Sequence, residues 1–256
     1  LRQRQMCIRV CACAVGAGIA GGDPALTGAR AALFVHGAGG GGWEWNVWRG
    51  VFEAAGFHVE APDLMPVHGD VAATRLEDYQ AQVRAACAAL PRPRVLVGAS
   101  LGGLLALGAA DGADAVVLVN PRPPAPWHAG LPVRDWPDVV PWRLAARLSG
   151  TREAMPDADD ATTLFAFRHW RDESGAVLRE AWRGVATERP ACPMLCVASG
   201  HDADVPPSIT RAVAEAWGAD LLQTVSGSHV GPLLGREAAG IAAQAVEWLN
   251  RAAKAG

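Results

Sequence analysis

Residues 98 to 102 read Gly98-Ala99-Ser100-Leu101-Gly102, a Gly-x-Ser-x-Gly pentapeptide. The apolar run Arg94–Val97 precedes it, and a helix-compatible stretch, Gly103–Leu107, follows it. In such a strand–turn–helix setting the serine is held in a strained backbone conformation, with its hydroxyl group pointing out of the sheet. We therefore predict that Ser100 is a nucleophile. An ordinary turn serine is the competing interpretation, because the chain contains 29 glycines.

A serine nucleophile needs a base, an acid that orients the base, and donors that bind the oxyanion. The predicted base is His229, which lies in a loop after the strand-like segment 221–225 and before the C-terminal helical stretch. Two carboxylates, Asp202 and Asp204, compete for the role of acid in the loop after the segment 193–198. We favour Asp202, because Asp204 is close enough to Pro207 to serve as a solvated or helix-start carboxylate.

A glycine-rich loop follows the apolar run 33–35 and spans residues 36–42, His36-Gly37-Ala38-Gly39-Gly40-Gly41-Gly42. Its glycines can be fitted to a dinucleotide-binding spacing, with Asp63 about twenty residues further on. However, Trp43-Glu44-Trp45 follows the loop where that motif requires the start of a helix. We expect instead that the backbone N–H groups of Ala38 and Leu101 bind an oxyanion, and that His36 only stabilises the loop.

These motifs resemble those of the α/β-hydrolase family, from about Ala31 to the C-terminus. The resemblance is carried by four segments: His36-Gly37-Ala38, Gly98–Gly102, the loop with Gly200 and Asp202, and Gly227-Ser228-His229. Residues 36–45, together with Leu76-Glu77-Asp78-Tyr79, are similar to the small methylesterase and hydroxynitrile-lyase branch of that family. Ala99 departs from this branch, in which a histidine commonly precedes the serine.

Apolar runs alternate with amphipathic stretches along the chain. The pattern predicts strands near 31–36, 57–61, 94–98, 115–120, 193–198 and 221–225, and helices near 46–55, 76–89, 101–110, 208–217 and 236–252. This alternation is typical of an α/β fold with a mostly parallel central sheet and helices on both faces. We expect residues 31–120 and 191–256 to form this core, with the predicted site at the carboxyl ends of its strands.

The segment 121–190 interrupts the alternation and is predicted to be a cap insertion of short helices and irregular structure. It contains five of the ten tryptophans: Trp127, Trp136, Trp142, Trp170 and Trp182. Indole rings over the site would favour apolar or aromatic substrates, although these rings would equally fill a small core of the insertion. We expect Gly39, Trp43 and Trp127 to contact the substrate. The charged cluster Arg168, Arg171, Asp172 and Glu173 is open to two interpretations, a solvated helical face or a substrate clamp, and we favour the solvated face.

Composition excludes several classes of protein. The formal net charge is −3 and no long basic run occurs, so no nucleic-acid partner is expected. No run reaches the roughly eighteen apolar residues of a membrane span, and no membrane association is expected. The six cysteines have neither a disulfide-framework nor a zinc-site spacing, and we interpret them as reduced thiols in a cytoplasmic protein.

Residues 1–30 allow two interpretations. Three arginines precede a short apolar stretch at 10–20, as in a signal peptide of an exported protein. Alternatively, Ile8-Arg9-Val10 suits an edge strand of the sheet, and we favour this interpretation together with a cytoplasmic location.

The predicted activity is hydrolysis of small carboxylic esters through an acyl-enzyme, with Ser100, His229 and Asp202 as the catalytic residues and without a metal or organic cofactor. A carbon–carbon hydrolase, a thioesterase, a lyase or an acyltransferase would use the same scaffold and the same residues. A non-catalytic ligand receptor on the same fold is the alternative from a different class.

Overall fold

The computed structural model describes residues 30–224 and 227–255. Its centre is a six-stranded sheet in the order β2-β1-β3-β4-β7-β8, and every neighbouring pair is parallel. The strands are β1 (Arg30–Val35), β2 (Phe57–Glu60), β3 (Arg94–Ala99), β4 (Ala115–Val119), β7 (Met194–Ala198) and β8 (Asp220–Gln223). The predicted fold class is confirmed. The expected edge strand at 8–10 and the signal-like stretch lie outside the described residues.

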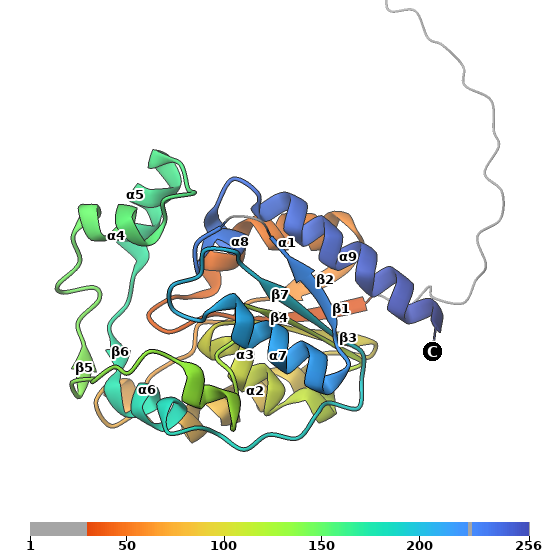
Figure 1. Cartoon of the computed structure of the whole chain (residues 1–256), viewed down its shortest axis with the longest axis horizontal. Helices are drawn as coiled ribbons and strands as arrows, with labels where there is room; N and C mark the ends of the chain where they lie inside the picture. Colours follow the sequence, from red (N-terminus) through yellow and green to blue (C-terminus); the bar gives the residue numbers. More distant parts are fainter. Residues whose placement is uncertain (1–29, 225–226, 256) are drawn as a thin grey trace, which may run out of the picture.

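Helices cover both faces of this sheet (Figure 1). On one face lie α1 (Asn46–Ala54), α8 (Gly231–Leu234) and α9 (Ala238–Ala255). On the other lie α2 (Leu76–Ala89), α3 (Leu101–Leu107) and α7 (Pro207–Trp217). Both layers were expected from the sequence, and the observed bounds of the long helix α2 are the predicted ones.

Two apolar cores result from the alternation of side chains along the buried strands. In β1, Leu33 and Val35 pack into the core beneath α2 and α3, whereas Phe34 packs into the core beneath α1 and α9. Because successive side chains of a strand point to opposite faces, an almost continuous apolar run supplies both cores. The sheet is therefore packed on both faces, and the loops that follow the strands begin at its carboxyl edge.

The insertion between β4 and β7 contains α4 (Leu148–Ala154), α5 (Asp160–His169), α6 (Gly175–Trp182) and a two-stranded antiparallel pair, β5 (Val139–Val140) and β6 (Glu173–Ser174). In Figure 1, α4, α5 and the β5–β6 pair extend from one end of the sheet, whereas α6 lies near α2. The start of α5 is fixed locally, since the Asp159 carboxylate accepts a hydrogen bond of 2.7 Å from the backbone N–H of Thr162. None of the helices among residues 30–224 and 227–255 is long and apolar enough to cross a membrane.

Candidate active site

Ser100 occupies the turn between β3 and α3 in a strained backbone conformation, with φ 52° and ψ −120°. Four hydrogen bonds hold this turn: the backbone N–H of Ser100 donates to Val119 O at 3.0 Å, and Ser100 O accepts from the N–H groups of Gly103, Leu104 and Arg122. A β-carbon at Gly98 would lie 2.3 Å from Gly102 O, and one at Gly102 would lie 2.2 Å from Val35 O. Glycine is thus required at both positions, because α3 lies so close to β3 and β1 that a β-carbon would collide with a backbone oxygen.

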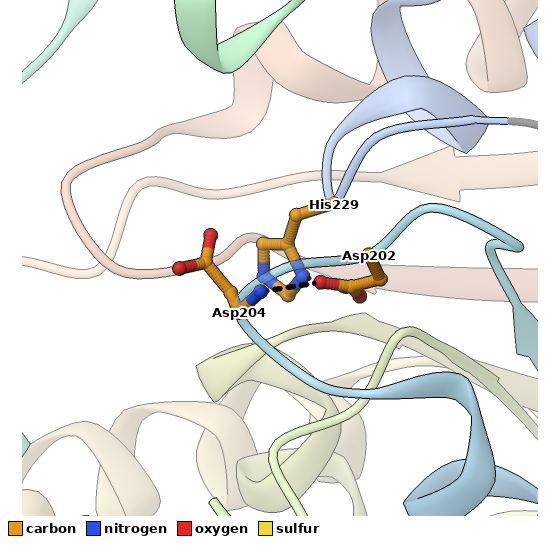
Figure 2. Close-up of side chains that lie close together, drawn as sticks. All are labelled: Asp202, Asp204 and His229. Carbon is orange, nitrogen blue, oxygen red and sulfur yellow. Dashed lines mark hydrogen bonds and ion pairs between the residues drawn. The ribbon is translucent and has the colours of Figure 1, made fainter. Parts of the chain in front are cut away.

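His229 lies beside Asp202, and its Nδ1 is 2.7 Å from Asp202 Oδ2 (Figure 2). The other carboxylate oxygen, Oδ1, accepts the backbone N–H groups of Asp204 and Val205 at 2.8 and 2.9 Å, so that the Asp202 side chain is fixed at both oxygens. The carboxyl group of Asp204 points away from the Nδ1 edge and pairs with Arg134. Of the two acids left open by the sequence, Asp202 is the one that contacts the imidazole.

The same three side chains offer ligand atoms within 4.8 Å of one another, a spacing that a metal ion also uses. Nδ1 of His229 and Oδ2 of Asp202, however, already share a hydrogen bond. That bond selects the tautomer with the proton on Nδ1, and it leaves Nε2 as an acceptor. This is the arrangement of a base and its orienting acid.

Residues far apart in the sequence hold the His229 loop in place. Asn120, at the end of β4, donates through Nδ2 to His229 O at 2.7 Å and to Ser199 Oγ at 2.8 Å. Asp157, in the insertion, accepts the backbone N–H and the hydroxyl group of Ser228 at 2.9 and 2.7 Å. Sequence reasoning missed both residues, because a single Asn or Asp in a loop carries no local signal of a distant partner.

The protonation of His229 follows from these neighbours. Burial lowers its pKa, but the hydrogen bond and the charge of Asp202 act in the opposite direction, and the net pKa of His229 is raised. A raised pKa means a more basic imidazole, which is better suited to accept a proton from a hydroxyl group. By contrast, burial lowers the pKa of His36 to about 4.

His36 therefore stays neutral, and both of its ring nitrogens are in use. Nδ1 lies 2.7 Å from Gly37 O, and Nε2 accepts the backbone N–H of Leu64 at 2.9 Å. These contacts agree with the stabilising position expected for His36.

The glycine-rich loop is held by two buried carboxyl groups on either side of Ala38. The backbone N–H of Gly37 donates to Glu44 Oε2 at 3.2 Å, and that of Gly39 donates to Glu173 Oε2 at 3.0 Å. Within the described part of the chain, the N–H groups of Ala38 and Leu101 have no hydrogen-bond partner, and both residues line the cavity that contains Ser100. Two free donors at one place fit the predicted oxyanion site.

Gly40 makes room for the Glu44 carboxyl group, since a β-carbon at position 40 would lie 2.2 Å from Glu44 Oε1. Burial raises the pKa of Glu44 to about 7. Sequence reasoning missed Glu44, although an acidic residue between two tryptophans is a signal of a buried carboxyl group. It also missed Glu173, whose Oε1 accepts the Tyr79 hydroxyl group at 3.0 Å.

A cavity of about 620 Å³ opens at Ser100 and His229. Four of the five tryptophans of the insertion line it: Trp136, Trp142, Trp170 and Trp182. The three residues expected to contact substrate do not line this cavity. Trp127 packs against Trp217, and Trp43 packs against Phe165 and Trp170. The backbone N–H of Gly39 donates a hydrogen bond to Glu173.

The prediction of a solvated helical face at 168–173 is wrong. Only Arg168 belongs to a helix, α5, while Glu173 lies in β6 and is 3% exposed. Arg171 donates through Nη2 to Leu64 O at 2.8 Å, and Asp172 accepts the backbone N–H of Arg143. Arg171, Asp172 and Glu173 contact the glycine-rich loop or neighbouring segments, whereas Arg168 is exposed. The sequence pattern alone does not contain these distant contacts.

The chain belongs to the alpha/beta hydrolase family, whose sequence pattern matches residues 32–244. This agrees with the family inferred from the motifs. No curated protein sequence matches the chain significantly.

Several solved structures share the fold. Polyneuridine aldehyde esterase is 16% identical with a TM-score of 0.67, covering 86% of this chain and 99% of its own. A methylesterase from Arabidopsis is 16% identical with a TM-score of 0.65, covering 88% and 99%. A pyrethroid hydrolase from Sphingobium faniae is 20% identical with a TM-score of 0.65, covering 88% and 98%. At these identities the likeness is one of fold.

Proposed function

We propose that this protein is a serine esterase that cleaves small carboxylic esters. The observation that supports this most strongly is the strained turn at Ser100 in the same cavity as His229, whose Nδ1 is bound by Asp202 at 2.7 Å. Esterases and hydrolases among the proteins of similar fold add to the proposal.

In the proposed reaction, Nε2 of His229 accepts the proton of the Ser100 hydroxyl group while Oγ attacks the ester carbonyl. The negative charge that develops on the carbonyl oxygen is bound by the N–H groups of Ala38 and Leu101. The protonated His229 then gives its proton to the leaving alcohol, and an acyl-enzyme remains on Ser100. Water, activated by the same imidazole, releases the acid and regenerates the free hydroxyl group. This route uses no metal and no organic cofactor.

The test is covalent labelling with a serine-directed fluorophosphonate together with turnover of chromogenic short-chain esters. We expect one label per chain on Ser100 and its loss in Ser100→Ala, with an esterase activity lower by several orders of magnitude. Ser208→Ala, an exposed hydroxyl in the first turn of α7, is the matched control. Labelling that persists in Ser100→Ala would contradict the proposal, and a wild-type chain that binds esters without labelling or turnover would favour a ligand receptor.

A further inference from the structure

Arg122 is the second residue after Asn120 at the carboxyl end of β4, and it is one of the residues that line the cavity containing Ser100. Its backbone N–H donates to Ser100 O at 2.8 Å, so the main chain of Arg122 is tied directly to that of the proposed nucleophile. Only 5% of the residue is exposed. A cation is thus buried at a fixed place relative to Ser100.

Among residues 30–224 and 227–255, this guanidinium group has no hydrogen-bond or ion-pair partner. Nε and Nη2 are buried without a hydrogen bond, and Arg122 forms no ion pair with any of the described residues. The group lies over the face of Trp182, with Cζ 3.2 Å from the ring centroid. Buried cations are normally paired, because removing a charge from water is costly. Stacking on Trp182 holds the plane of the group but supplies no acceptor.

The neighbouring charges leave Arg122 unpaired. Asp204 lies nearby, but its carboxylate pairs with a second arginine, Arg134. Of the other acids that line the cavity, Glu44 accepts the N–H of Gly37, and Glu153 is exposed. Burial, with the charge of Arg134, lowers the pKa of Arg122 to about 9, so the group still carries its charge at neutral pH.

We propose that Arg122 forms an anion subsite, and that the preferred substrates are esters whose apolar stem ends in a free carboxylate. The inference rests on the proposed ester hydrolysis. A guanidinium group binds a carboxylate through charge-assisted N–H···O hydrogen bonds, and stacking on Trp182 holds the Arg122 group in place for such a ligand. The indole rings of Trp136, Trp142 and Trp182 then cover the stem between the ester and the carboxylate.

The test compares esters that differ only in the charge of the distal group. Monomethyl glutarate, adipate and pimelate are assayed beside the neutral dimethyl ester of each acid, and kcat/KM is measured for every pair. In the wild-type protein we expect at least one monoester to exceed its neutral partner by about 10- to 100-fold, as a charged hydrogen-bonded pair predicts. In Arg122→Gln we expect this ratio to fall to about one. Because both esters of a pair are assayed with the same preparation, the ratio of their kcat/KM values does not depend on the fraction of folded protein.

Two further variants sharpen the result. Arg122→Lys keeps the charge without the planar fork, and it should retain part of the preference. Arg183→Gln removes an exposed arginine directly after Trp182, and it should leave the preference unchanged. A wild-type ratio near one for all three acids would overturn the inference, as would an equal loss of preference in Arg183→Gln.

A binding measurement separates failure of this inference from failure of the proposed activity. Glutarate, adipate and pimelate are titrated calorimetrically into the Ser100→Ala protein and into the double variant Ser100→Ala/Arg122→Gln. We expect the best ligand to bind about tenfold more weakly without Arg122. Equal affinity in both proteins would overturn the anion subsite even where esters are cleaved. Arginine-dependent binding without any ester turnover would support the subsite and contradict the esterase.

Discussion

The carboxyl group of Glu173, in the insertion, accepts a hydrogen bond of 3.0 Å from the backbone N–H of Gly39, in the glycine-rich loop. Its second oxygen, Oε1, accepts the Tyr79 hydroxyl group and the backbone N–H of Ser174. One buried side chain therefore joins the insertion, α2 and the loop that carries Ala38. The position of a proposed oxyanion donor depends on residues more than a hundred positions further along the chain.

We predict that Glu173→Gln lowers kcat for ester hydrolysis about tenfold with little change in KM. An amide cannot accept hydrogen bonds at both ends, so either Gly39 or Tyr79 loses its acceptor and the Ala38 N–H shifts; loss of a whole oxyanion donor costs more, about 100- to 1000-fold. Steady-state kinetics measure the split between kcat and KM. Glu188→Gln, at an exposed position, is the control, and a change confined to KM would contradict a positioning role.

The two loop carboxylates are predicted to differ sharply. Asp202→Asn should lower kcat by about 10³- to 10⁴-fold, because an amide facing Nδ1 no longer stabilises the tautomer and the charge that His229 needs. Asp204→Asn removes only a partly exposed pair with Arg134 and should change kcat less than about tenfold. The reverse order of the two kcat values would transfer the orienting role to Asp204.

The buried carboxyl group of Glu44 should make the stability of the protein depend on pH. Burial raises the pKa of Glu44 to about 7 in the folded chain, from its ordinary value of 4.5. Between these values the folded state binds more protons than the unfolded state, so this group's contribution to stability is present at low pH and is lost as pH rises through 7. Glu44→Gln carries no such titration.

The free energy of unfolding of Glu44→Gln, relative to wild type, should therefore increase between pH 5 and pH 8, by at most on the order of 3 kcal/mol. Urea unfolding at several pH values measures the difference. All other titrating groups are present in both proteins, so their contributions to the difference in free energy of unfolding cancel to first order. A difference that is independent of pH, as expected for the exposed control Glu188→Gln, would show that Glu44 is ionised throughout this range.

The cavity predicts how activity depends on acyl length. Each methylene buried against the indole rings contributes about 0.8 kcal/mol, so kcat/KM should rise over the first added carbons. A cavity of about 620 Å³ has a finite length, and kcat/KM should then fall sharply for long chains. A series of p-nitrophenyl esters measures this profile. A preference that rises steadily through long chains would show that the insertion leaves an open groove.

Several elements of the fold and of the site are predicted by local sequence alone. The strands β1, β3, β4 and β7 are near-continuous apolar runs between helical stretches, so local pattern alone predicts a parallel sheet. The Ser100 turn is equally local, because its glycines, strand and helix are contiguous. His229 follows from its place after the last strand. All of these depend on residues that are neighbours in the chain.

By itself, then, the sequence determined the fold class, the Ser100 turn and the loops that carry His229 and Asp202. Only the tertiary structure decided which acid contacts the imidazole, which carboxyl groups flank Ala38, which tryptophans line the cavity, and that Arg122 is buried without a partner. These facts depend on side chains from separate elements that meet only after the insertion folds against the sheet. Glu173 illustrates the reason: its sequence neighbours are charged and typical of a solvated surface, yet folding removes it from water and places it against Gly39 and Tyr79.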